Sequence, residues 1–312
     1  MKASKIQTFV QSTLGNAIQH HSPKFIARGL NFAYHALVNR FEFNNRNGVD
    51  IFAEDWDTLV ILDACRYDMF AEQNTLPGTL EARVSKGSST VEFLEANFTN
   101  KDLRDTVYVT GNPQYYNNHK RINANFHNVQ NIWMEDGWDS ESGTVLPRAV
   151  TEAALKAHDQ YPNKRIIIHY IQPHFPFIGS DVGKGSFEHE DDELNIWEKL
   201  FTGELEEDNE TIWNAYNRNL AVTLPHVERL LKNVDGRTVV TADHGNLVGE
   251  RVYPIPIKEW GHPRGLYVQP LIKVPWLVTE SKNRRETTPG EVVTKDQQSN
   301  AAEERLKQLG YV

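Results

Sequence analysis

The chain alternates between short runs of apolar and β-branched residues and longer stretches in which apolar residues recur every three or four positions. Short continuous runs are typical of parallel strands that are covered on both faces, and the longer spacing is typical of amphipathic helices. The strand-like runs span residues 58–62, 106–111, 165–171, 238–242 and 272–278. The helix-like stretches span residues 90–98, 147–161 and 212–231. This alternation predicts an α/β fold with a largely parallel central sheet that has helices on both faces.

The first 48 residues have a different character. Apolar positions at helical spacing in 6–17 and 25–37, separated by a Ser-Pro pair, predict two helices. Residues 1–41 contain five basic side chains and no acid, although the whole chain has a net charge of −9. Basic amphipathic helices bind anionic membrane surfaces, but a hairpin packed on the main domain or on a second subunit is the interpretation we favour.

We therefore divide the chain into three parts. Residues 1–48 form the basic helical segment, residues 49–280 form the main domain, and residues 281–312 form a polar, mobile linker that ends in a short helix over 301–310. Inside the main domain, residues 114–146 are rich in Asn, His, Asp and Ser and are predicted to form a long loop. Residues 181–210 are acidic and are predicted to form a solvated insertion.

The composition limits the class of protein. With 312 residues, 39% hydrophobic and 24% charged, the chain is expected to be soluble and globular. No run is long and apolar enough to span a membrane, and the N-terminus lacks the apolar core of a secretory signal. The only cysteine, Cys65, excludes intrachain disulfides and a cysteine-based zinc cage. These features predict a cytoplasmic protein that does not bind nucleic acid, with peripheral membrane association through 1–41 and homo-oligomerisation left open.

Acidic residues and an imidazole follow two of the predicted strands. Asp63 comes directly after the run 58–62, and Asp243-His244-Gly245 follows the run 238–242. Because ligands gather at the carboxyl ends of strands in open α/β sheets, we expect these side chains to lie close together. Two buried carboxylates repel each other unless a cation neutralises them, and a carboxylate–imidazole set can hold a divalent metal. The alternative for the second motif is a strand-ending turn with a surface histidine.

Several other residues are candidates for chemistry. Ser88, Ser89 and Thr90 begin a predicted helix, where hydroxyl groups act as N-caps and where anions also bind. His174 is held between two prolines just beyond a strand, which suits a ligand or a proton donor. His169 lies within that strand and is predicted to be a satisfied core residue. Arg66 and Asp68 are predicted to form a local ion pair at the start of the next helix, and Cys65 to be buried.

These motifs, in this order, resemble the alkaline phosphatase and sulfatase superfamily. The resemblance covers roughly residues 55–278. It rests on a strand ending in aspartate followed by Arg-x-Asp, a nucleophile at a helix start, a Pro-His-x-Pro turn, Asp-His-Gly after a strand, and a late Gly-His pair. In this sequence these are Asp63 with Arg66 and Asp68, Thr90, Pro173 to Pro176, Asp243 to Gly245, and Gly261-His262. The resemblance implies an alkaline-phosphatase-like fold with 49–280 as the catalytic domain.

The resemblance also implies roles for single residues. Asp63, Asp243, His244 and the hydroxyl of Thr90 would bind one divalent metal, which is Mn²⁺, Mg²⁺, Ca²⁺ or Zn²⁺. Thr90 would be the nucleophile, with Ser88 and Ser89 as alternatives. His174 and His262 would bind the transferred group, protonate the leaving oxygen or hold a second metal. Further candidates for substrate binding are Ser88, Ser89, Arg66 and Arg264.

Two departures from the superfamily pattern narrow the function. Cys65 lacks the Cys-x-Pro-x-Arg context of formylglycine sulfatases, and Tyr170 stands where two-metal members carry an aspartate four residues before the histidine. The pattern is closest to one-metal, threonine-using members, which include phosphoglycerol transferases. We expect a metal-dependent hydrolase of phosphate or sulfate esters that acts on a glycan- or lipid-linked anionic substrate. A phosphoglycerol- or phosphoethanolamine-type transferase in cell-surface polymer synthesis and a non-catalytic binding protein are the alternatives.

Overall fold

The computed structural model describes residues 23–39, 44–134, 137–183, 194–281, 283–293 and 305–306. A seven-stranded sheet forms its centre, with the strand order β2-β11-β8-β1-β7-β3-β4. The strands are β1 (Thr58–Leu62), β2 (Thr79–Val84), β3 (Asp102–Thr110), β4 (Asn125–Asn131), β7 (Arg165–Tyr170), β8 (Arg237–Thr241) and β11 (Lys273–Glu280). Strands β8, β1, β7, β3 and β4 pair in parallel, whereas β11 is antiparallel to both of its neighbours, β8 and β2. The predicted α/β class with a largely parallel sheet is therefore confirmed.

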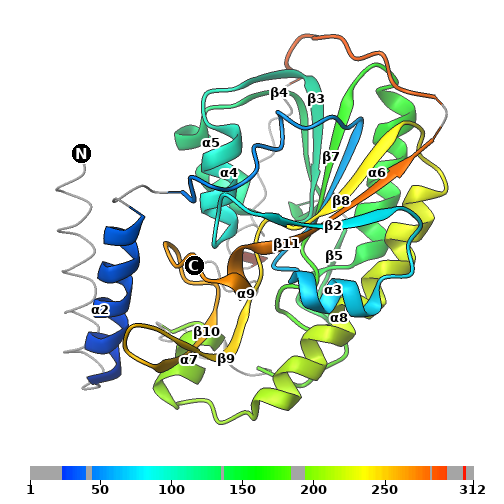
Figure 1. Ribbon diagram of the computed structural model, residues 1–312. Helices are drawn as coiled ribbons and strands as arrows, with labels where there is room; N and C mark the ends of the chain where they lie inside the picture. Colours follow the sequence, from blue (N-terminus) through cyan, green and yellow to red (C-terminus); the bar gives the residue numbers. More distant parts are fainter. Residues whose placement is uncertain are drawn as a thin grey trace.

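Helices cover both faces of this sheet, as the sequence pattern predicts (Figure 1). One face packs on α6 and α8 and the other on α4 and α5, and each face has its own hydrophobic core. The helices are α2 (Pro23–Val38), α3 (Tyr67–Gln73), α4 (Thr90–Phe98), α5 (Gln114–Ile122), α6 (Pro147–Gln160), α7 (Ile196–Thr202), α8 (Asn209–Leu231) and α9 (Gln269–Ile272), with a 3₁₀ turn η1 (Ile132–Met134). Strand β1 is fully buried along its length because it lies near the middle of the sheet.

Two small hairpins lie outside the central sheet. They are β5 (Trp138–Asp139) with β6 (Thr144–Val145), and β9 (Leu247–Val252) with β10 (Ile257–Gly261). Helix α2 packs against the second hairpin through Asn31, whose side chain donates to Ile255 O and accepts from Ile255 N, both at 2.8 Å. Arg28 adds an ion pair to the buried Glu259 at 2.9 Å. The predicted packing on the main domain therefore holds for α2, while residues 1–22 lie outside the described residues.

Two loop predictions differ from the structure. Residues 114–146 contain α5, β4, η1, β5 and β6, because β4 extends the sheet as an edge strand beside β3. The polar residues of β4 do not show the apolar pattern of a strand, since an edge strand needs few apolar side chains. Residues 283–293 have no regular structure, but their backbone bonds to the main domain at Asn163, Arg104 and His127. Of the predicted helix 301–310, only residues 305–306 are described. Of the acidic stretch 181–210, residues 184–193 lie outside the described residues.

Candidate active site

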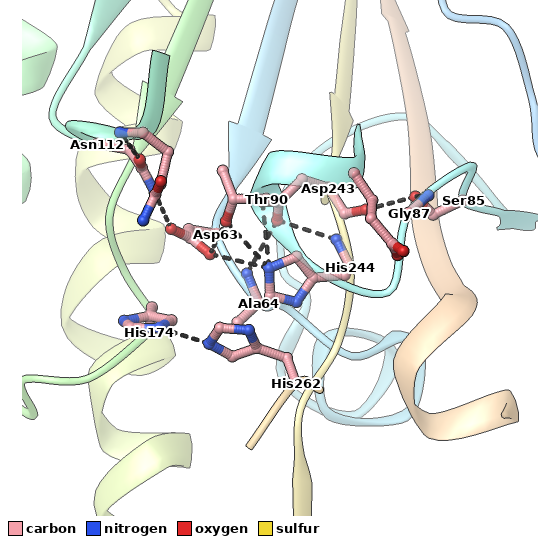
Figure 2. Close-up of polar contacts among 12 residues, drawn as sticks. Asp63, Ala64, Ser85, Gly87, Thr90, Asn112, His174, Asp243, His244 and His262 are labelled. Atoms are coloured by element: carbon pink, nitrogen blue, oxygen red, sulfur yellow. Dashed lines mark hydrogen bonds and ion pairs between the residues drawn. The ribbon is translucent and has the colours of Figure 1, made fainter. Parts of the chain in front are cut away.

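The strand-end residues meet because β1 and β8 are neighbours that run in parallel. Asp63 follows β1 directly, and Asp243 and His244 follow β8 by two and three residues. Thr90, the first residue of α4, points its hydroxyl toward the same place (Figure 2). The ligand atoms of Asp63, Asp243 and His244 lie within 4.8 Å of one another, and all three side chains are buried.

The distances within this cluster centre on His244 Nε2. This atom lies 3.1 Å from Thr90 Oγ1, 3.3 Å from Asp243 Oδ2 and 3.5 Å from Asp63 Oδ1. On its other side, His244 Nδ1 lies 2.7 Å from Gly245 O, which only accepts, so Nδ1 carries the proton. In this orientation His244 Nε2 faces two carboxylate oxygens. A cation among these electron-rich atoms would remove their mutual repulsion.

Two further observations support a cation at this place. Asp243 Oδ2 is buried and accepts no hydrogen bond within the described part of the chain. Burial, first, and the neighbouring Asp243 carboxylate, second, raise the pKa of Asp63 well above its usual value. The residues therefore fit a divalent metal held by Asp63, Asp243, His244 and Thr90. This donor set of three oxygens and one imidazole is compatible with Mn²⁺, Mg²⁺, Ca²⁺ and Zn²⁺.

A surrounding layer of hydrogen bonds holds the two carboxylates. Asn112 Nδ2 donates to Asp63 Oδ2, while its own Oδ1 accepts from Gln114 N at 2.7 Å. Asp243 Oδ1 accepts from Ala64 N at 3.0 Å and from the backbone N–H of His244 at 2.9 Å. Sequence reasoning missed Asn112, although it stands just beyond β3 at the same edge of the sheet as Asp63. The same strand-end signal that found Asp63 would have found it.

His174 and His262 form a second pair of imidazoles beside this cluster (Figure 2). Their Nε2 atoms are 2.8 Å apart, and the His262 ring lies 4.6 Å from that of His244, centroid to centroid. His174 Nδ1 donates to Phe175 O, so its Nε2 accepts and His262 Nε2 carries the shared proton. Burial lowers the pKa of His174 to about 4, and desolvation with the neighbouring His244 and His174 lowers that of His262. Both rings are therefore neutral at pH 7.

The remaining predicted site residues make contacts of their own. The predicted ion pair forms, since Arg66 bonds Asp68 through Nε at 2.9 Å and through Nη2 at 2.6 Å, and it also pairs with Glu250. Arg264 pairs with Glu95, and Ser88 is buried among hydrogen bonds to other protein groups. Arg66, Arg264 and Ser88 are thus held by the protein, and their predicted contacts with substrate stay predictions.

Ser89, Cys65 and His169 have simpler surroundings. Ser89 is the N-cap of α4, but its Oγ makes no hydrogen bond with any described residue. Cys65 is buried and free, as predicted. His169 is buried, but it is not a satisfied core residue. Tyr108 OH lies 2.7 Å from its Nδ1, whereas its Nε2 lies 3.8 Å from Asp243 Oδ2 and bonds no described group.

No protein-family model matches the chain, and no curated protein matches it either. Its structure is similar to the C-terminal periplasmic domain of EptC from Escherichia coli, with 16% identity, 76% of each chain covered and a TM-score of 0.48. It is also similar to EptA from Neisseria meningitidis (12% identity, 90% of this chain, 59% of that chain, TM-score 0.45). A third is the lipoteichoic acid synthase LtaP from Listeria monocytogenes (11% identity, 75% of this chain, 66% of that chain, TM-score 0.39).

The likeness to these solved structures concerns the fold alone, because the identities are at most 16% and the TM-scores are below 0.5. At such identities it assigns no substrate to this chain. The predicted cytoplasmic location is at odds with these structures, since the EptC domains are periplasmic and EptA is an integral membrane protein. Among the described residues, no helix combines the length and the apolar character that a membrane span requires.

Proposed function

We propose that this protein is a metal-dependent enzyme that transfers a phosphate-type or sulfate group from an ester through a covalent intermediate on Thr90. The observation that carries this proposal is the convergence of Thr90 Oγ1 with His244 Nε2 at 3.1 Å and with Asp63 Oδ1 at 3.4 Å. A hydroxyl that only capped α4 would bond the backbone of its own helix. Instead, this hydroxyl points into a cluster of metal-ligating atoms.

Each side chain has a distinct part in such a reaction. Thr90 Oγ1 would form the new bond to phosphorus or sulfur, while the bond to the leaving oxygen breaks. A divalent cation in the cluster would lower the pKa of the Thr90 hydroxyl and neutralise the charge of the transferred group. His174 and His262 would bind its outer oxygens and give the leaving oxygen a proton. Asn112 keeps the Asp63 carboxylate in place.

The second half of the reaction distinguishes two kinds of enzyme. A hydrolase resolves the Thr90 adduct with water, whereas a transferase resolves it with the hydroxyl of an acceptor. We favour transfer to a glycan- or lipid-linked acceptor, in line with the similar transferases, and keep hydrolysis as the second candidate. Turnover of a phosphodiester with and without glycerol or a sugar acceptor separates the two. Transfer requires that the acceptor diester forms at the expense of the phosphate monoester that hydrolysis releases.

The test of the nucleophile compares Thr90→Ala with Thr90→Ser. The alanine variant should lose at least about a thousandfold in kcat because the nucleophile is absent, while the serine variant keeps a hydroxyl and should retain measurable turnover. Peptide mapping by mass spectrometry should find the covalent adduct on residue 90 of the wild type. Metal content is measured in all three proteins, since Thr90 is also a proposed ligand.

Two outcomes would overturn this proposal. Turnover by a metal-loaded Thr90→Ala protein would place the nucleophile elsewhere, with Ser88 and Ser89 as the nearest hydroxyls. A wild-type protein that binds metal but turns over neither phosphate monoesters, phosphate diesters nor sulfate esters would favour the non-catalytic binding protein.

We also propose that α2 contacts an anionic membrane surface, which would bring the site to a lipid-linked substrate. Five large apolar side chains on α2 are between 47% and 63% exposed, namely Ile26, Leu30, Tyr34, Leu37 and Val38. The lack of acids in residues 1–41 complements an anionic surface. Helix α2 packs on β10, and β10 leads directly to His262.

Sedimentation with vesicles tests this contact. The full chain should bind vesicles that contain phosphatidylglycerol but not neutral ones, and Leu30→Glu with Leu37→Glu should abolish the binding. The matched control is Val292→Glu with Val293→Glu, which adds the same two charges at two exposed valines, 46% and 44% exposed, in the C-terminal segment. Equal vesicle binding by all variants would refute the contact. A concentration-dependent dimer that these changes dissociate would instead assign the face to a second copy of the chain.

A further inference from the structure

The carboxyl group of Glu92 is buried beside the site but is not directed at the metal cluster. Glu92 is the third residue of α4 and only 2% exposed. Its Oε2 accepts from Ser88 N at 2.9 Å and lies 2.8 Å from Ser88 Oγ. Its Oε1 accepts from Tyr267 OH at 3.2 Å and lies 3.6 Å from Arg264 Nε. One carboxyl group therefore joins the start of α4 to a segment that is about 170 residues away in the sequence.

Ser88 adds two contacts between the same two parts of the chain. Its Oγ accepts from Gly265 N at 3.0 Å and lies 3.1 Å from Pro263 O. Burying a serine hydroxyl and a carboxyl group is unfavourable unless both are hydrogen-bonded, and here both are. We call these contacts of Glu92 and Ser88 with residues 263–267 the Glu92 clamp.

The clamp lies directly next to two proposed catalytic residues. Thr90 is two residues before Glu92 on α4, and His262 immediately precedes the segment 263–267. The central sheet does not set the position of His262, because β10 belongs to the separate two-stranded sheet with β9. Its ring also contacts the rings of His174 and His244, and the neighbouring Gly261 pairs with Leu247 of β9. Of these contacts, the clamp ties the segment beside His262 to α4, the helix that carries Thr90.

We propose that Glu92 is a positioning residue that holds His262 in place relative to Thr90. This inference rests on the proposed function, because it assigns a purpose to the His262 position in group transfer. A group that acts on the leaving oxygen must be placed closely, since a misplacement of about 1 Å lowers a rate about a hundredfold. Glu92 touches neither the metal cluster nor the His174–His262 pair, so its effect is exerted through His262.

The kinetic test is a double-mutant cycle between Glu92 and His262. Glu92→Ala should lower kcat about ten- to a hundredfold with unchanged metal content, because Asp63, Asp243 and His244 remain in place. Glu92→Gln should restore most of the activity, since its amide oxygen can still accept from Ser88 and its NH₂ faces Tyr267 OH. In the His262→Ala background, Glu92→Ala should add no further loss. Full additivity of the two losses would overturn the proposal, because it would mean that Glu92 acts independently of His262.

A second readout does not depend on activity. The Arg264–Gly265 bond lies within the clamped segment, and the Arg264 side chain is 41% exposed and therefore accessible to trypsin. Glu92→Ala should be cut at this bond at least about tenfold faster than the wild type, with Glu92→Gln close to the wild type and cutting after Arg121 unchanged. Equal rates in Glu92→Ala and the wild type would refute the clamp. If the wild type turns over no ester, the proposed function fails, but this measurement still decides whether the clamp exists.

Discussion

Replacing Asp243 by Asn should leave the metal-free protein at least as stable as the wild type. The same substitution should make the metal-loaded protein less stable than the wild type. Asp243 Oδ1 accepts two backbone hydrogen bonds, which an asparagine oxygen can also accept. Oδ2 faces the cluster without a hydrogen bond among the described residues. The substitution therefore removes a buried charge and keeps the local hydrogen bonds.

In the metal-free state, that charge is unfavourable. An uncompensated buried polar group destabilises by about 1–3 kcal/mol, so the metal-free variant should be at least as stable as the metal-free wild type. The difference should grow with pH. Asp63, whose pKa is raised by burial and by Asp243, contributes stability below its unfolded pKa that is lost as the pH rises through the folded pKa. In the variant, no carboxylate at residue 243 raises the pKa of Asp63, so less stability is lost as the pH rises.

In the metal-loaded state, the order reverses. A metal at about a thousand times its Kd stabilises the wild type by about 4 kcal/mol, and a hundredfold weaker Kd in the variant leaves about 1.4 kcal/mol. At about 2–4 °C per kcal/mol, the metal should raise the Tm of the wild type by about 8–16 °C and that of the variant by only a few degrees.

The assay is calorimetry of both proteins at pH 6 and pH 8, first in EDTA and then with Mn²⁺ or Zn²⁺, together with metal content by mass spectrometry. Two results would refute the reasoning. One is a metal-free variant that is clearly less stable than the metal-free wild type at pH 8. The other is an equal rise in Tm for both proteins when metal is added.

Two further predictions concern residues around the cluster. Asn112→Ala removes the donor to Asp63 Oδ2 and should weaken metal binding about ten- to a hundredfold in a titration, whereas unchanged affinity would show that Asn112 does not orient Asp63. Burial lowers the pKa of His169 to about 4, so lowering the pH from 7 to 5 should destabilise the wild type by about 2 kcal/mol relative to His169→Gln. Denaturant unfolding of the metal-free proteins measures this difference, and parallel pH profiles would contradict it.

Much of the arrangement of residues at the candidate site could be predicted from the sequence. Asp63 and Asp243 stand directly after runs that are apolar on both faces, and such runs form inner strands of parallel sheets. Strand ends in such a sheet share one edge, so local order along the chain predicts that these residues meet. The hydroxyl of Thr90 at a helix start and His174 after a strand follow the same logic.

Other features were not readable in this way. Residues 114–146 look like a loop because β4 is a polar edge strand, and its identity as a strand comes only from pairing with β3. The pairing of Arg66 with Glu250 and of Arg264 with Glu95 could not be predicted either. Those partners are more than 150 residues away in the sequence, and no local period encodes such a pairing.

The sequence by itself determined the α/β class and the set of residues that can carry the chemistry, because strand runs, caps and turns are local patterns in the chain. Only the tertiary structure decided that β1 lies between β7 and β8, that Asn112 supports Asp63, and that Glu92 joins α4 to the segment after His262. These arrangements depend on which distant segments are buried against each other. Burial and hydrogen-bond satisfaction are properties of the whole fold, so they became visible only when the chain was assembled.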